Sequence, residues 1–472
     1  MSAIRIGIAS LSGVFLLAGC AVQRYRPAPI VASATASKFE SRSLADPGLQ
    51  SFEEQNLGHP VSPWPRQTWD LQTLSLAALY FNPALESARA RAAGAEAALV
   101  TAGARPNPTL SIAPGIPSPY LLTLDFAFPI ETAGKRRHRI QVARSLNQVA
   151  RFDLADSSWT IHSGVRIALV NYLMASRTLE SFRSEEKVRE DQVNILEQIF
   201  SAGEIPRQSV DLARMELSKT HMATAMADGQ VRETKAALAA AVGLSVAALQ
   251  SVDFSWPNID APPSAASLSP GQIQRGAVLN RLDLRRSLAQ YAAAEAALQL
   301  EIAKQYPDIN IGPGYTYEEK HSFFTVGFST TVPLFNRNQG PIAEAEARRK
   351  EAAAVFLERQ AQIIAKSERA LAVYTAALEE LSEAESLRKL QETQLQITQQ
   401  TVRAGADNRL SLDSVEIQSW VLTRARLDAL ARAQRALGEL EDAVQRPLGP
   451  GEMFTITPES PALIGSPKDL KR

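Results

Sequence analysis

Residues 120–139 have the sequence YLLTLDFAFPIETAGKRRHR, and the hydrophobic period changes within them. Up to Pro129 apolar side chains alternate with small or polar ones, which is the period of a strand with two different faces. From Lys135 to Ala202 the chain contains no proline and one glycine, and it is rich in strong helix formers. The stretch therefore predicts a strand that runs directly into one nearly continuous helix.

The predicted helix over 135–202 is too long for a compact domain. At 1.5 Å per residue it spans about 100 Å, so we expect it to lie in a bundle or tube of equally long helices. A second alternating segment over about 323–332 is followed by a second long helical segment over 341–404, which has neither proline nor glycine after Pro341. A strand that leads into a very long helix is thus predicted twice.

The composition excludes several classes of function. The 472 residues carry 50 basic and 50 acidic side chains, so no net field favours nucleic acid or an acidic substrate. One cysteine and five dispersed histidines exclude a disulfide or a Cys/His metal cage within one chain. We find no paired acid and base and no activated nucleophile, so we expect no enzyme, no cofactor and no metal site.

Residues 1–20 have the features of an export signal. Arg5 precedes an apolar stretch that is too short to span a membrane as a helix, and the stretch ends in Leu17-Ala18-Gly19-Cys20. This ending resembles the lipobox of bacterial lipoproteins, in which the cysteine becomes the lipidated first residue. We therefore expect a lipid anchor on Cys20, and by the same resemblance Ala21 favours the outer membrane. The alternative is a signal peptide with an incidental cysteine.

The rest of the chain divides at changes in composition and period. The expected segments are an extended tether over 21–66 rich in Pro, Ser and Ala, a first repeat over 67–252 with strands over about 109–116 and 120–130, a Pro- and Ser-rich linker over 253–270, a second repeat over 271–449 with strands over about 309–317 and 323–332, and a tail over 450–472. The sequence AEAAL occurs at 95–99 and again at 294–298. Together with the same order of elements, this favours duplication over chance.

The four predicted strands cannot form a closed sheet within one chain. Each is about ten residues long, which is enough to cross a bilayer with tilt, and each has an apolar and a small or polar face. In hydrocarbon an open edge leaves backbone groups unsatisfied, so copies must combine. Two copies give a filled eight-stranded barrel, whereas three give twelve strands and a lumen. We therefore predict a mainly helical fold with a small β-barrel part, in which three copies form one twelve-stranded barrel in a membrane and their long helices form a hollow tube. A soluble sandwich core is the alternative interpretation of the alternation.

The chain resembles the TolC family of outer-membrane channel proteins, and within it the CzcC-type lipoproteins of heavy-metal resistance. The motifs that carry the resemblance are the lipobox, Asn82-Pro83-Ala84-Leu85, Arg105-Pro106-Asn107-Pro108, Phe128-Pro129-Ile130-Glu131 and Val332-Pro333-Leu334-Phe335-Asn336. The resemblance implies a homotrimer in outer-membrane lipid, with a trimeric, twelve-stranded outer-membrane β-barrel on a periplasmic α-helical barrel. This trimer would serve as the exit duct of a tripartite, RND-type efflux system. Its partners would be a periplasmic adaptor protein and an inner-membrane pump.

The resemblance also implies a constriction near the periplasmic turns. In this family a turn after the long helix is followed by a helix whose acidic residues narrow the pore. Gly203 and Gly405 match the two turns, and Ser411 occupies a position where the motif commonly has Asp. The nearby acids Asp413 and Glu416 are three residues apart and so share a helix face, and Asp211 has a similar position in the first half; the alternative is a solvated face of an amphipathic helix.

Three functions remain open at this level. The first is a passive exit duct for heavy-metal cations or other small toxic solutes. The second keeps the channel but assigns it to drug efflux or to type I protein secretion. The third is a non-conducting structural lipoprotein that spans the periplasm as a coiled coil, which sustained heptads without paired strands would favour.

Overall fold

The computed structural model describes residues 24–115 and 121–449. The chain forms two compact units, Met1–Arg42 and Ser43–Arg472. In the first unit the described part contains the helix α2 (Ala32–Glu40), and the second unit holds the other described helices and strands. Cys20, residues 116–120 and the predicted tail over 450–472 lie outside the described residues.

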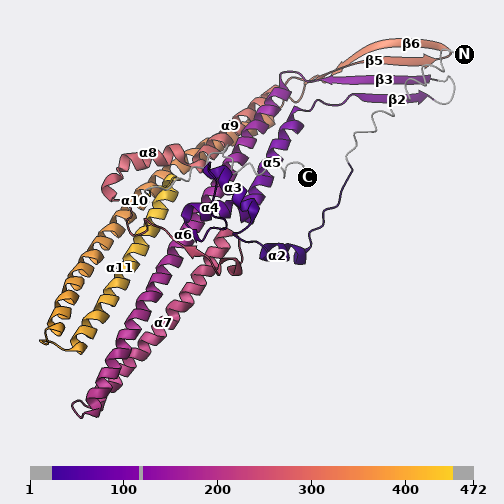
Figure 1. Cartoon of the computed structure of the whole chain (residues 1–472). Helices are drawn as coiled ribbons and strands as arrows, with labels where there is room; N and C mark the ends of the chain where they lie inside the picture. Colours follow the sequence, from indigo (N-terminus) through magenta and orange to yellow (C-terminus); the bar gives the residue numbers. More distant parts are fainter. Residues whose placement is uncertain (1–23, 116–120, 450–472) are drawn as a thin grey trace. The chain divides into compact units, whose positions relative to one another are not determined.

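Two long helical hairpins dominate the second unit (Figure 1). They consist of α6 (Lys135–Ser201) with α7 (Arg207–Val242), and of α10 (Gln339–Arg403) with α11 (Arg409–Val444). With 67 residues in α6 and 65 in α10, each long arm spans about 100 Å. The order α5-β2-β3-α6-α7 in the first half recurs as α9-β5-β6-α10-α11 in the second, where α5 is Pro83–Gly103 and α9 is Leu282–Ala303.

The two hairpin turns have the same hydrogen-bond pattern. Gly203 (φ 79°) and Gly405 (φ 73°) follow the long helices in the left-handed conformation, which glycine adopts without strain. In each turn the glycine N–H and the next N–H donate back to the last turn of the helix. The bonds are Gly203 to Phe200 (2.9 Å), Glu204 to Ile199 (3.2 Å), Gly405 to Val402 (3.0 Å) and Ala406 to Thr401 (2.9 Å). These turns set the register of each returning helix.

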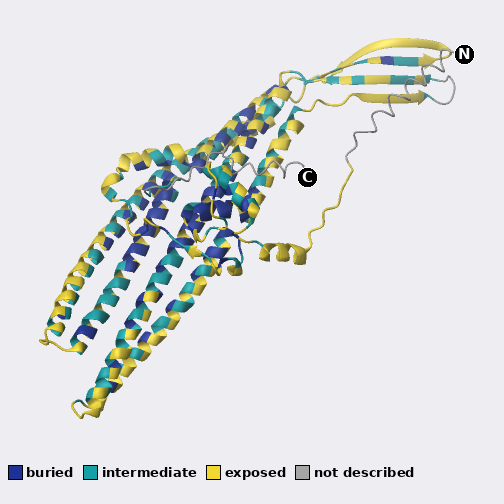
Figure 2. Ribbon diagram, in the orientation of Figure 1, coloured by how far each residue is buried: buried dark blue, intermediate teal, exposed yellow. Residues whose placement is uncertain are grey.

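The core lies along the middle of α6, where α4 (Leu71–Phe81) and the second half of α11 each pack against it. Leu74, Leu169 and Leu430 are fully buried there, and they belong to one continuous hydrophobic cluster. Figure 2 shows burial concentrated in this central part, while the hairpin ends and the sheet are mostly exposed or intermediate. Among the described helices none is long and apolar enough to cross a membrane.

The main sheet has four antiparallel strands in the order β2-β3-β5-β6. They are β2 (Thr109–Gly115), β3 (Leu121–Ile130), β5 (Ile309–Glu318) and β6 (His321–Thr330). A separate short pair, β1 (Thr68–Trp69) and β4 (Asp253–Phe254), is parallel. The main sheet therefore combines one strand pair from each half of the chain.

The expectation of an extended tether over 21–66 is wrong for two segments. Residues 32–40 form α2, and residues 47–57 form α3 (Pro47–Leu57). The α3 helix begins where the Asp46 carboxylate accepts a 2.7 Å hydrogen bond from the Gly48 N–H, and it ends at Gly58 in the left-handed conformation. These are ordinary capping signals, and they outweigh the Pro- and Ser-rich composition of the segment.

The segment over 253–270 is packed onto the helices. Trp256 and Ile259 within it are buried, and the Ile259 carbonyl accepts a 2.6 Å hydrogen bond from the Gln434 side chain of α11. The Tyr374 hydroxyl of α10 donates to the Pro263 carbonyl. The linker between the two halves therefore ties α10 and α11 together and is part of the core.

Candidate functional site

The strand register places the larger apolar side chains of the sheet on one face. Leu124 lies opposite Ile112 on one side and Tyr315 on the other, and Tyr315 in turn lies opposite Phe324. The residues on this face are Leu110, Ile112, Pro114, Leu122, Leu124, Phe126, Phe128, Ile130, Ile309, Ile311, Pro313, Tyr315, Tyr317, Ser322, Phe324, Val326, Phe328 and Thr330. We call it the apolar face.

The opposite face carries small and polar side chains. Asp125 lies opposite Ser111 and Gly314, and Gly314 lies opposite Thr325. A Cβ atom on Gly314 would come within 2.5 Å of both the Asp125 carboxylate and the Thr325 hydroxyl, so the face is closely packed at this point. Leu121 and Phe323, both near strand ends, are its larger apolar members. The sheet is therefore amphipathic across its two faces.

Within residues 24–115 and 121–449, the apolar face is left largely uncovered at its β6 edge. Phe324, Val326 and Phe328 on β6 are each at least 80% exposed. Among the described strands, β2 and β6 pair on one side only, so each presents unpaired backbone groups at an edge. A contiguous apolar surface of this kind marks contact with lipid or with another chain.

Ionic contacts hold the junction between the sheet and α6. Lys135 forms a 2.7 Å ion pair with Asp308, whose carboxylate also accepts a 3.0 Å hydrogen bond from the Thr132 N–H. Partial burial acts to raise the pKa of Asp308, but these two donors hold it below its usual range. Arg139 pairs with Glu131 on the same side. The basic segment after β3 is thus used for packing at the base of the sheet.

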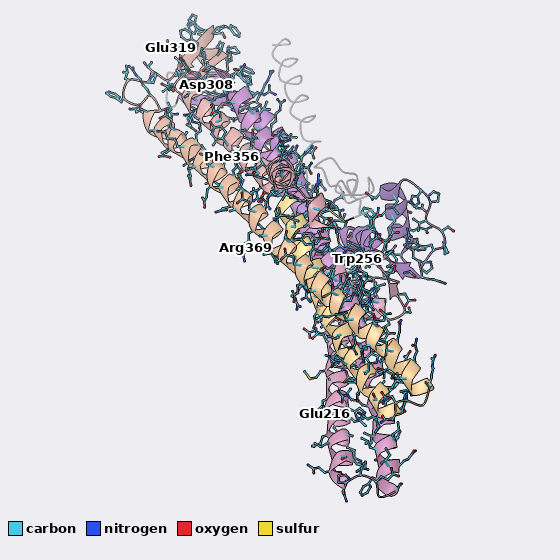
Figure 3. All side chains as sticks on the ribbon, turned by 90° about the vertical axis from the view of Figure 1, so that its left-hand side faces the viewer. Glu216, Trp256, Asp308, Glu319, Phe356 and Arg369 are labelled. Atoms are coloured by element: carbon cyan, nitrogen blue, oxygen red, sulfur yellow. The ribbon has the colours of Figure 1, made fainter. Side chains whose placement is uncertain are left out.

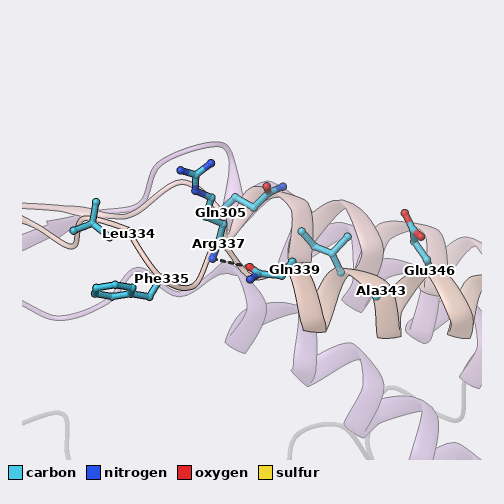
Figure 4. A pocket seen from close by; sticks show the side chains of 8 residues that line it. Gln305, Leu334, Phe335, Arg337, Gln339, Ala343 and Glu346 are labelled. Carbon is cyan, nitrogen blue, oxygen red and sulfur yellow. Dashed lines mark hydrogen bonds between the residues drawn. The ribbon is translucent and has the colours of Figure 1, made fainter.

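A recess of about 640 Å³ lies at the other junction, between β6 and α10 (Figure 4). Its lining includes Leu334, Phe335 and Arg337, and the Arg337 N–H donates a 2.8 Å hydrogen bond to the Gln339 side chain. Phe335 is 96% exposed. The motif over 332–336 therefore presents apolar side chains at the base of the sheet, next to the exposed apolar face.

The acidic residues that the sequence suggested for a constriction lie near the start of α11, in different environments. Asp413 is fully buried, and Arg409 Nε lies 2.8 Å from its Oδ1 atom. Arg409 also lies 3.7 Å from Glu416, whose side chain is 22% exposed. Burial raises the pKa of Asp413 against the lowering effect of Arg409, and the charges of Glu416 and of Asp191 on α6 raise it further. Asp413 thus lies in the contact between α11 and α6.

The equivalent acid of the first hairpin is exposed. Asp211 lies 3.5 Å from Arg207, four residues earlier on α7, and its side chain is half exposed. Asn408 caps α11: its side-chain oxygen accepts a 2.9 Å hydrogen bond from the Ser411 N–H, and the Ser411 hydroxyl donates to Asp407 at 2.7 Å. Gly203 and Gly405 form the two turns and contribute no side chain. Of the predicted acids, Asp211 and Glu416 keep exposed surface and Asp413 does not.

A buried polar cluster that sequence reasoning missed joins α6 to α11. Arg166 forms a 2.7 Å ion pair with Glu441, donates a 2.7 Å hydrogen bond to the Gln434 carbonyl, and lies over the Trp256 ring. Gly438 makes room for it, because a Cβ atom there would lie 2.7 Å from Arg166 Nη1. Only a glycine within a helical segment signals this cluster in the sequence. The cluster fixes how the two hairpins meet.

The comparisons with known proteins identify the family. The model of the outer membrane efflux protein family matches residues 74–244 and 275–444, which together make up most of the chain. The chain belongs to the outer membrane efflux protein family. The resemblance to this group of channels is therefore confirmed, and the family is one of channel proteins rather than enzymes.

One curated relative of the family is the cobalt-zinc-cadmium resistance protein CzcC of Cupriavidus metallidurans. The two chains are 26% identical over 277 residues, a match that covers 58% of this chain and 64% of CzcC. The chain thus matches less than two thirds of the length of this relative.

Solved structures of outer-membrane proteins share the fold. VceC from Vibrio cholerae matches with a TM-score of 0.64 at 21% identity, over 80% of this chain and 97% of VceC. The channel OprN matches with a TM-score of 0.64 and CusC with 0.62, both at 18% identity over 90% of this chain and 99% of theirs. The prediction of a mainly helical fold of this channel type is confirmed.

Proposed function

We propose that this protein is the outer-membrane duct of a tripartite, RND-type efflux system. The observation that carries the proposal is the four-stranded sheet with an exposed apolar face, a small and polar face and two unpaired edges. In a bilayer the apolar face contacts lipid and the polar face lines water, and the edges must pair because hydrocarbon offers no hydrogen bonds.

Three copies satisfy these edges and leave a lumen. Pairing β6 of one copy with β2 of the next gives a closed ring, and twelve strands enclose a water-filled interior where eight are filled by side chains. The helical hairpins of three copies then form a periplasmic helical barrel about 100 Å long, to which an adaptor and an inner-membrane pump dock. The pump supplies the energy and the trimer conducts passively.

Lipidation of Cys20 is part of the proposal. The lipobox Leu17-Ala18-Gly19-Cys20 supports it, because the chain's single cysteine lies in the one position that the motif requires. The anchor adds membrane affinity to that of the barrel, so Cys20→Ala should abolish acyl labelling while trimers still form.

The constriction is proposed to lie at the start of α11, close to the turn at Gly405. There Arg409 bridges Asp413 and Glu416, and Asp413 is buried against the α6 side. Separation of the two hairpins by an adaptor would expose Asp413 and add its charge to those of Glu416 and Asp211. Three copies of these acids around an axis would attract cations.

Heavy-metal cations are the proposed cargo. The support is the printed function of CzcC, a cobalt-zinc-cadmium resistance protein, together with the acids near the constriction. A deletion strain should tolerate less cobalt, zinc and cadmium salt than its parent, and the wild-type gene on a plasmid should restore growth. Lost tolerance to a drug panel alone would assign the duct to drug efflux, and loss of a secreted protein alone would assign it to type I secretion. Unchanged growth and secretion in every condition would contradict the proposal.

A further inference from the structure

We propose that Glu186, Glu190 and His221 form a binding site for a borderline divalent cation such as Zn²⁺ or Co²⁺. The two glutamates lie on α6, and the histidine lies on α7, the returning arm of the same hairpin. The proposal does not depend on the function proposed above, because it concerns binding by the isolated chain.

The hairpin register brings the three side chains together. Glu186 and Glu190 are four residues apart and so occupy one face of α6. His221 Nε2 lies 3.1 Å from Glu186 Oε1 and 3.9 Å from Glu190 Oε1, and one donor atom from each residue lies within 4.8 Å of the others. Glu216, five residues before His221 on α7, marks this level of the hairpin in Figure 3.

The distances suit a small cation. Donor atoms around a tetrahedral zinc ion, with bonds of about 2.0–2.1 Å, stand roughly 3.3 Å from one another. The distances from His221 Nε2 to Glu186 Oε1 and to Glu190 Oε1 lie on either side of this value. Small side-chain rotations therefore bring all three donor atoms to bonding distance from one ion. One imidazole and two carboxylates are ligands that zinc and cobalt accept, and a fourth position stays open to water.

The two carboxylates lack the cationic partners that other acids of this hairpin have. Glu185, the neighbour of Glu186, is buried and pairs with Arg189 and with Arg424 of α11. In the described part of the chain, no lysine or arginine lies within ion-pair distance of Glu186 or Glu190, and His221 is the basic group that each contacts. Two carboxylates with one imidazole leave a local negative charge that a dication neutralises.

A further contact orients one of the ligands. The Thr224 hydroxyl, three residues after His221 on α7, donates a 2.7 Å hydrogen bond to Glu186 Oε2. This bond holds one carboxylate oxygen and directs the other toward His221. Hydrogen bonds to metal ligands orient them in the same way in known metal sites. The side chain of His221 is about half exposed, as is that of Glu190, so a cation reaches the site from solvent.

A cation bound here would link the two arms of the hairpin. Glu190 and Glu186 precede the end of α6 at Ser201 by 11 and 15 residues, which places the link about 17–22 Å from the turn. Because the ion binds the folded hairpin and not separated arms, it should stabilise the chain by an amount that rises with the logarithm of its concentration once that exceeds the dissociation constant.

The test uses the full-length protein in detergent, stripped with a chelator and titrated with ZnCl₂ by calorimetry and with CoCl₂ by visible absorption. We expect one saturable site per chain and cobalt bands typical of nitrogen and oxygen ligands. His221→Gln and the double variant Glu186→Gln/Glu190→Gln should each weaken binding by about ten-fold or more, since the loss of a residue that only orients a metal ligand already costs roughly 10–100-fold in affinity. Zinc should raise the unfolding temperature of the wild type and not that of His221→Gln.

Matched controls separate this site from general attraction of cations to acids. Glu379→Gln/Glu383→Gln removes an exposed pair with the same spacing on α10, and His59→Gln removes an exposed histidine elsewhere; neither should change binding. The proposal is overturned if His221→Gln binds as tightly as the wild type, if the α10 variant loses as much affinity, or if Mg²⁺ competes at equal concentration. Circular dichroism establishes that each variant is folded.

Discussion

The two faces of the sheet make different predictions for the same substitution. Val326 lies in the middle of β6 on the apolar face and is 82% exposed in the single chain, while its neighbour Thr325 lies at the same depth on the polar face. Covering most of a valine side chain with lipid gains roughly 1–2 kcal/mol. An arginine at the bilayer midplane costs about 2–4 kcal/mol on the lipid face of a barrel. This cost is that of the whole substitution and includes the lost burial of Val326, so Val326→Arg should destabilise each membrane-inserted chain by about 2–4 kcal/mol, and a trimer carries the substitution three times.

Thr325→Arg is the matched control. Its side chain would face the lumen, close to Asp125, and should leave assembly nearly unchanged. The two variants are compared by yield in the outer-membrane fraction, by heat-modifiable migration of the trimer, and by urea titration after refolding into lipid vesicles. Equal tolerance of the two variants, or equal loss, would mean that the sheet does not lie in a bilayer and would refute the assignment of its faces.

Three further predictions concern the helical part. Burial, and then the charge of Arg166, lower the pKa of His162 to about 3 from 6.5. Above pH 6.5 the ring is neutral in both the folded and the unfolded chain. Below pH 6.5 only the unfolded chain takes up the proton, so the free energy of unfolding decreases as the pH falls from 6.5 toward 3. At pH 5 the loss of unfolding free energy is roughly 2 kcal/mol, which should appear as a lower unfolding midpoint in detergent. His162→Gln should make this midpoint less dependent on pH, and the same pH dependence in the variant would contradict the assignment to His162. Arg166→Met leaves Glu441 buried without its partner and should destabilise the chain by about 3–5 kcal/mol, while Arg166→Met/Glu441→Leu should regain most of it; a double variant as unstable as the single one would argue against the ion pair as the cause. Asp413→Ala with Glu416→Ala should raise the conductance of the purified protein in planar bilayers or lower its preference for cations, and wild-type values of both would place the constriction elsewhere.

The mainly helical fold could be predicted because its signals are local. Segments without proline and rich in helix formers leave few alternatives over more than 60 residues, and a glycine ends each long helix in the conformation that glycine favours. The faces of the sheet follow from alternation, since a period of two assigns every second side chain to one side whatever the partner strand.

Side-chain partners between distant segments could not be predicted in this way. The burial of Asp413 depends on how α11 packs against α6, while the matching Asp211 stays exposed in a similar local sequence. His221 lies next to Glu186 because the turn at Gly203 sets the register of the hairpin. In the sequence the histidines are far from one another, so their spacing gave no sign of this contact. Composition also hid α3, whose capping residues Asp46 and Gly58 carry the helix signal.

The two unpaired edges of the sheet have a consequence for biogenesis. In a newly exported chain, the outer edges of β2 and β6 each present a row of unpaired backbone donors and acceptors. Water forms hydrogen bonds with these groups before another strand pairs with them. The correct neighbour and any other extended polypeptide compete for the same rows, so the lifetime of the unassembled chain decides the yield. Overproduction raises the concentration of unassembled chains and favours mispaired aggregates. Slow synthesis with ample membrane allows each edge strand to pair with the edge strand of another copy in the trimer.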